Sequence, residues 1–165
     1  KMSLSVGRPN NGFQVRAKKL KKADFLVIRE KSKDAVFGHP ALVLMLQRSA
    51  KQIARAVPGA KLVVGDLSSK EGGPLAGHHS HQSGRDADLG FYMRDAKGKL
   101  VTSEKFVSKP LRAPLLAFAK KHEKDEKLSE KAAGLFVQPD NAEPHDDHLH
   151  VRIRCPKGQQ AVCIE

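Results

Sequence analysis

The chain has 165 residues, of which 30 are Lys or Arg and 18 are Asp or Glu, so its formal net charge is +12. This length suits a single domain, residues 1–165, with a core large enough to fold by itself. No apolar stretch approaches the roughly 20 residues that a membrane-spanning helix needs. The positive charge favours anionic partners, but with no Trp and one Tyr the chain has few side chains for stacking on nucleic acid bases. We therefore expect no specific nucleic-acid binding.

Apolar spacing and turn residues predict an α+β fold, a small and mainly antiparallel sheet with flanking helices. Residues 1–17 are expected to form an exposed N-terminal arm, because a Gly-Arg-Pro-Asn-Asn-Gly turn interrupts them. A helix is predicted from Pro40 to Val57, where apolar residues recur at helical spacing and Pro58-Gly59 follows. The remaining predictions are a second amphipathic helix over 110–121, strands over 25–29, 61–66, 86–93, 134–137 and 148–153, and a hairpin-like turn at 95–98.

Histidine placement is the strongest functional signal. Six of the eight histidines fall in two short polar segments, 77–88 and 145–150, which together also contain four Asp residues. Imidazole nitrogens and carboxylate oxygens are donors that zinc accepts with tetrahedral geometry. Adventitious metal binders and purification tags are also rich in His, but they lack the interleaved Asp, Gly and strand alternation of these segments. We therefore interpret the two segments as the site of a zinc hydrolase.

The spacing within each segment indicates how the side chains come together. Polar and apolar residues alternate over 148–154, which predicts a half-buried strand with His148, His150 and Arg152 on one face. By the same alternation, Asp86 and Asp88 share the polar face of an earlier strand. Two other histidines are not expected to act: His39 precedes Pro40 at a helix start, and His122 lies in a Lys/Glu-rich helix. The helical zinc-protease motif is absent, because residue 126 is Glu where that motif needs His.

A family resemblance rests on these residues. His81, Asp88 after six intervening residues and a distant His-x-His resemble the metallopeptidase group of lysostaphin-type enzymes, D-Ala-D-Ala peptidases and the hedgehog zinc domain. The segments 38–42, 64–68, 77–88, 136–139 and 148–156 occur in the order seen in penicillin-insensitive murein endopeptidases. The similarity extends from about Ser5 to Cys163. It implies a hedgehog/D-Ala-D-Ala peptidase-like fold with a zinc cleft on one face of the sheet.

The resemblance also implies a reaction and roles for individual residues. The reaction is hydrolysis of D-alanyl to meso-diaminopimelyl crosslinks in peptidoglycan, without inhibition by β-lactams. One Zn²⁺ would be bound by His81, Asp88 and His150, with water as the fourth ligand. The general base would be His148, with His145 as the next candidate, and His78 and Arg152 would contact substrate. Second-shell partners that could orient these groups are Asp86, Asp147 and His145.

Alternatives stay open at this point. A related peptidase could cleave another bond, such as D-Ala-D-Ala or a stem-peptide linkage, and a non-catalytic wall-binding domain could keep a zinc site. We expect a periplasmic or secreted protein attracted to an anionic cell-wall polymer, with its export signal outside this sequence because no basic-then-apolar segment follows Met2. Cys155 and Cys163 lie close together, so they form either a local disulfide, which would suit an exported protein, or two free thiols.

Overall fold

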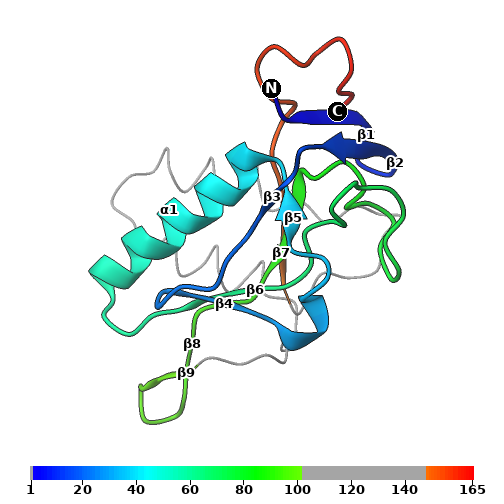
Figure 1. Cartoon of the computed structure of the whole chain (residues 1–165). Helices are drawn as coiled ribbons and strands as arrows, with labels where there is room; N and C mark the ends of the chain where they lie inside the picture. The colour runs from blue at the N-terminus through cyan, green and yellow to red at the C-terminus, as the bar shows by residue number, and fades with distance from the viewer. Residues whose placement is uncertain (1, 102–147) are drawn as a thin grey trace, which may run out of the picture. The chain divides into compact units, whose positions relative to one another are not determined.

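The computed structural model of the chain describes residues 2–101 and 148–165 (Figure 1). Two compact units are distinguished, one of residues 1–105 with 149–165 and one of residues 106–148. The elements below belong to the first unit. The helix and strand predicted over 110–121 and 134–137 lie outside the described residues, as do His122, His145 and Asp147. The single domain therefore stays a prediction.

An α+β class is confirmed by the order of elements along the chain. They are β1 (Leu4–Arg8), β2 (Asn11–Val15), β3 (Lys18–Lys19), β4 (Leu26–Ile28), the 3₁₀ turn η1 (Glu30–Ser32), β5 (Phe37–Gly38), α1 (Pro40–Ala56), β6 (Leu62–Val64), β7 (Asp86–Leu89), β8 (Met93–Arg94), β9 (Leu100–Val101) and β10 (Leu149–Arg152). Within the described ranges, no helix is long and apolar enough to cross a membrane.

The central sheet has the strand order β10-β7-β6-β4. β4 and β6 are parallel, whereas β7 pairs antiparallel with both β6 and β10. The register between β7 and β10 sets His150 opposite Asp88 and Arg152 opposite Asp86. Residues from two distant parts of the sequence thus meet as direct cross-strand neighbours.

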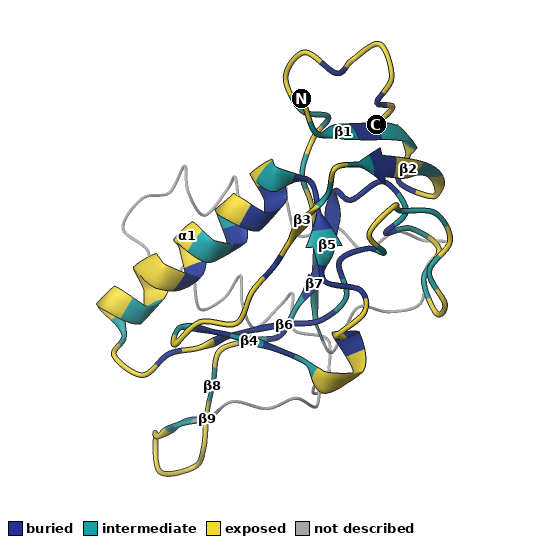
Figure 2. Cartoon of the chain, viewed as in Figure 1, coloured by how far each residue is buried: buried dark blue, intermediate teal, exposed yellow. Residues whose placement is uncertain are grey.

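Helix α1 covers one face of this sheet. Pro40 occupies its first turn, where a missing N–H costs nothing, and the Nδ1 atom of His39 accepts a hydrogen bond from the Ala41 N–H at 3.2 Å. This capping role agrees with the expectation that His39 is structural. The inward side of the helix is buried and its outer side exposed (Figure 2), and its buried residues are Leu42, Val43, Leu46 and Ala50. Burying each large side chain stabilises the fold by about 1.5–3 kcal/mol.

The same core fixes which face of β7 carries its carboxylates. Ala87 is fully buried in the cluster that contains Leu42, Leu46 and Val64. Because side chains alternate along a strand, Asp86 and Asp88 project from the opposite face. The sheet therefore separates the apolar core from the polar residues of β7.

The first residues of the chain differ from the exposed arm that we expected. β1 and β2 form an antiparallel hairpin, and Ser5 is fully buried. Its N–H donates to Gln159 Oε1 at 2.8 Å and its hydroxyl donates to the Ser83 carbonyl at 2.8 Å. In Figure 1 the C-terminal segment runs beside β1, where Gly7 N donates to Val162 O at 2.7 Å. These partners are far away in sequence, so local pattern gave no sign of them.

The predicted strand 86–93 is also shorter in the structure. β7 ends at Leu89, and Met93–Arg94 forms β8, which pairs with β9. The predicted turn at 95–98 is confirmed: Asp95 Oδ1 accepts hydrogen bonds from the backbone N–H groups of Lys97 and Lys99, both at 2.9 Å. The predicted strands 25–29, 61–66 and 148–153 correspond to β4, β6 and β10.

Candidate metal centre

Two of the predicted ligands, His81 and His150, converge on one carboxylate oxygen of the third, Asp88. Asp88 Oδ1 lies 3.3 Å from His81 Nε2 and 3.5 Å from His150 Nδ1. The His81 and His150 rings are 4.8 Å apart between centroids. Asp88 and His150 meet because β7 and β10 pair in this register, whereas His81 reaches the site from the loop before β7.

Hydrogen bonds determine which nitrogen each ring turns toward Asp88. His81 Nδ1 lies 2.6 Å from the Leu67 carbonyl oxygen, and His150 Nε2 lies 2.8 Å from Asp86 Oδ1. A carbonyl and an ionised carboxylate can only accept, so these two nitrogens carry the protons. In the neutral rings His81 Nε2 and His150 Nδ1 are then the electron-pair donors. Both donors face Asp88.

This arrangement fits a metal ion. At zinc–ligand distances of about 2.0–2.2 Å, two ligands of a tetrahedron lie roughly 3.3–3.6 Å apart. The distances of 3.3 and 3.5 Å from Asp88 Oδ1 fall in this range. In addition, His81 Nε2 is buried and makes no hydrogen bond with any described residue. A buried polar atom without a hydrogen bond is costly, and a cation bound there would satisfy it.

His78 extends the cluster on the other side of Asp88. Its Nδ1 lies 3.8 Å from Asp88 Oδ2, and its Nε2 donates to Asp66 Oδ2 at 2.9 Å. The donor atoms of His78, His81 and Asp88 all lie within 4.8 Å of one another, close enough to hold a metal ion. The imidazoles of His78 and His150 therefore flank Asp88. Each donates a hydrogen bond to a second carboxylate, His78 to Asp66 and His150 to Asp86.

The surrounding charges shift the pKa values of the buried groups. Burial acts to lower the pKa of His81, but the Asp88 and Asp86 carboxylates outweigh it and raise that pKa above its usual value. Burial acts to raise the pKa of Asp86, yet the hydrogen bond from His150 and the charge of Arg152 hold it below its usual value. The pKa of Asp66 is lowered in the same way by His78, against the effect of burial. The centre is thus an anionic cluster that favours a positive charge.

The backbone of His81 has an uncommon conformation. Its φ angle is +68°, in the left-handed region that residues other than Gly rarely adopt. Its N–H donates to Asp86 Oδ2 at 3.3 Å, and its side chain is fully buried. Such conformations cost on the order of 1–3 kcal/mol and are concentrated at functional sites.

The remaining predicted site residues have different outcomes. Arg152 is exposed, and its Nε donates to Asp86 Oδ1 at 2.5 Å. His148 directly precedes β10 but belongs to the second compact unit, and His145 lies outside the described residues, so their roles stay predictions. Sequence reasoning missed Asp66 and the Leu67 carbonyl. Asp66 ends the predicted buried strand of residues 61–66 and Leu67 follows it, and both lie in the segment 64–68 on which the family resemblance partly rests.

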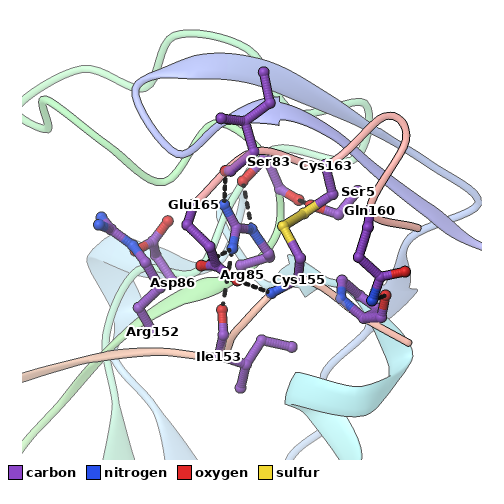
Figure 3. A network of polar contacts seen from close by, with 12 residues as sticks. Ser5, Ser83, Arg85, Asp86, Arg152, Ile153, Cys155, Gln160, Cys163 and Glu165 are labelled. Carbon is purple, nitrogen blue, oxygen red and sulfur yellow. Dashed lines mark hydrogen bonds and ion pairs between the residues drawn. A yellow bond between two sulfur atoms is a disulfide. The ribbon is translucent and has the colours of Figure 1, made fainter. Parts of the chain in front are cut away.

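A second polar network lies next to β7 (Figure 3). The guanidinium of Arg85 is fully buried and donates to Glu165 Oε2 at 2.9 Å and to the Ile164 carbonyl at 2.6 Å. Cys155 and Cys163 form a disulfide, so the disulfide alternative is confirmed. The Cys155 N–H also donates to Glu165 Oε1 at 2.6 Å.

This network ties the segment after β10 to β7. Ile153 N donates to the Arg85 carbonyl at 3.0 Å, which continues the β7–β10 pairing past the end of β10. Arg85 directly precedes Asp86, and Ile153 lies three residues after His150. The C-terminal segment is therefore held beside the two strands that carry candidate ligands.

Comparison with known proteins gives consistent similarities. The profile of one family, described as penicillin-insensitive murein endopeptidase, matches residues 5–138. A penicillin-insensitive murein endopeptidase from Klebsiella pneumoniae (strain ATCC 700721 / MGH 78578) is 28% identical over 189 aligned positions, which cover 93% of this chain and 67% of that protein. A protein of the same description from Escherichia coli O1:K1 / APEC is 34% identical over 87 positions, covering 52% of this chain and 31% of that protein.

Proposed function

This chain belongs to the penicillin-insensitive murein endopeptidase family, and we propose that it hydrolyses peptidoglycan crosslinks with one zinc ion bound by His81, Asp88 and His150. It is a murein endopeptidase, a peptidase that acts on peptidoglycan. The observation that carries the zinc proposal is the spacing of 3.3 and 3.5 Å between Asp88 Oδ1 and the two imidazole donors. A zinc ion held by these three protein ligands would keep one position for water, as catalytic zinc sites do.

The protein's own groups account for orientation and proton transfer. A bound zinc supplies a water of lowered pKa, about 7, and polarises the scissile carbonyl. Leu67 and Asp86 hold the His81 and His150 rings with the correct nitrogens toward Asp88. We propose His148 as the general base that accepts the proton of the attacking water, because it lies two residues before His150, and His145 as the next candidate.

Substrate contacts are assigned to His78 and Arg152. His78 flanks Asp88 and is partly exposed, with 21% of its side-chain surface accessible. The Arg152 side chain is 41% exposed and is held by Asp86 through Nε, which leaves its terminal nitrogens to bind a carboxylate of the stem peptide. Because the reaction needs no acyl-enzyme serine, β-lactams should not inhibit it.

The bond that we propose is the D-alanyl to meso-diaminopimelyl crosslink. Cleavage of D-Ala-D-Ala or of a stem-peptide linkage is the alternative. Digestion of purified, crosslinked muropeptides followed by mass spectrometry of the products separates them, because each bond gives fragments of different mass. Products that are monomeric stem peptides with an intact terminus would support cleavage of the crosslink. Release of free D-Ala alone would contradict it.

Action on peptidoglycan places the enzyme at the cell wall, and we propose a periplasmic location. We further propose that the net charge of +12 draws the enzyme to the anionic wall polymer. The hedgehog/D-Ala-D-Ala peptidase-like architecture of the family group also belongs to this proposal.

Metal analysis tests the ligand set. Asp88→Ala and His150→Ala should each lose the zinc that the wild-type protein binds at one ion per chain. His79→Ala is the matched control, because His79 lies in the same segment but is exposed, and it should keep its zinc. Wild-type zinc content in both ligand variants would refute the assignment.

A further inference from the structure

One buried carboxylate touches both candidate histidine ligands. Asp86 Oδ1 accepts a hydrogen bond from His150 Nε2 at 2.8 Å, and Asp86 Oδ2 accepts one from the backbone N–H of His81 at 3.3 Å. The Asp86 side chain is fully buried. It therefore acts on the ring of one histidine and on the main chain of the other.

From these contacts we propose that Asp86 is a positioning residue that prepares both histidines for the metal. Its Oδ1 selects the His150 tautomer with the proton on Nε2, so that Nδ1 faces Asp88 Oδ1 at 3.5 Å. Its Oδ2 holds the His81 main chain at a φ of +68°, which directs Nε2 to the same oxygen from 3.3 Å. This inference rests on the proposed zinc site, but the tautomer that it requires exists without metal.

Arg152 keeps the Asp86 carboxylate in place. The cross-strand register sets Arg152 directly opposite Asp86, and its Nε donates to the same Oδ1 that receives the His150 proton. Two donors on one oxygen and one donor on the other fix the plane of the carboxylate. Mutation of a residue that accepts a hydrogen bond from a metal-binding imidazole typically weakens metal affinity by about 10- to 100-fold.

Asp66 offers a matched comparison at the same centre. It accepts from His78 Nε2 at 2.9 Å, which reproduces the Asp86–His150 pair at nearly the same distance. It differs in two ways, because 27% of its side-chain surface is exposed and the imidazole that it orients is not a proposed ligand. The Asp66→Asn and Asp86→Asn variants thus make the same chemical change in the hydrogen-bond partners of two different imidazoles, those of His78 and His150.

The decisive experiment is zinc affinity, measured by competition with a chelator. In Asp86→Asn one carboxylate oxygen becomes an amide nitrogen, which cannot accept the His81 N–H, and the negative charge is lost. We expect a 10- to 100-fold weaker zinc Kd for Asp86→Asn and a change below about threefold for Asp66→Asn. Equal, small changes in both variants would overturn the proposal. A larger loss in Asp66→Asn would also overturn it and would assign the ligand role to His78.

A measurement on the metal-free wild-type protein tests the proposal even if the Asp86→Asn variant does not fold. Imidazole ¹⁵N shifts near pH 9, well above the ordinary His pKa of about 6.5, report which nitrogen carries the proton. The proposal requires His150 to be protonated on Nε2, and a proton on Nδ1 would overturn it. If the wild-type protein binds no zinc, the zinc proposal fails, whereas the role of Asp86 is still decided by this tautomer.

Discussion

Opening the Cys155–Cys163 disulfide should destabilise the protein by an amount set by its short loop. The two cysteines are separated by 8 positions, and the chain-entropy relation for a loop of this length gives about 2.5 kcal/mol at 25 °C. In proteins of 150–250 residues, 1 kcal/mol shifts Tm by roughly 2–4 °C. We therefore expect Tm to fall by about 5–10 °C on reduction.

Thermal unfolding followed by circular dichroism, with and without reductant, measures this effect. Intact mass after alkylation confirms that both thiols have been released. The Cys155→Ala/Cys163→Ala variant controls for other effects of the reductant, since its Tm should not respond. A Tm change below about 1 °C after complete reduction would refute the reasoning, because it would mean that the hydrogen bonds of Arg85 hold the segment without help from the disulfide.

Four further predictions concern the site and the surface. His148→Ala should keep its zinc but lose roughly 10²- to 10⁴-fold in kcat, and near-full activity would place the base elsewhere. His81→Gly and His81→Ala should both lose zinc. The Gly variant should be more stable than the Ala variant by about 1 kcal/mol and have the higher Tm, because Gly tolerates the φ of +68° without strain. Equal Tm values for the two variants would contradict this. The hydrogen bond from the Cys155 N–H and the charge of Arg85 lower the pKa of Glu165 below its usual 4.5, so its contribution to stability is present above about pH 4.5 and is lost as the pH falls through the lowered pKa. Glu165 is largely exposed, so Glu165→Gln should remove less than about 1 kcal/mol of this pH dependence in acid unfolding, and unchanged pH dependence would refute it. Finally, binding to sacculi should weaken as salt is raised, since the Debye length falls to about 3 Å near 1 M, and salt-independent binding would exclude electrostatic attraction.

The sequence predicted the parts of the site that depend on local spacing. Alternation placed Asp86 with Asp88 and His150 with Arg152, and the structure pairs these residues across β7 and β10. Helix α1 was predicted because its apolar residues recur at helical spacing and Pro40 starts it. In each case the determining pattern lies within a single element.

The features that escaped prediction depend on long-range contacts. The segment that forms the hairpin of β1 and β2 was expected to be an exposed arm because a Gly-Arg-Pro-Asn-Asn-Gly turn interrupts it, yet its Ser5 and Gln14 are buried. Asp66 became part of the site only through His78, and no spacing rule links a carboxylate after one strand to a histidine in a later loop. β7 also ends earlier than predicted: the Gly90 N–H still donates to the Val63 carbonyl of β6, and the chain then leaves the sheet.

The pairing of β7 with β10 also determines when the site becomes complete during synthesis. His150 follows Asp86 by 64 positions, and ribosomes add about 5–20 residues each second. An emerging chain therefore presents His81 and Asp88 for roughly 3–13 s before His150 exists. Contacts between such distant segments also form late in folding, because loop closure must precede them. Under the proposed ligand set of His81, Asp88 and His150, a nascent chain therefore lacks one metal ligand until β10 has been added to the sheet.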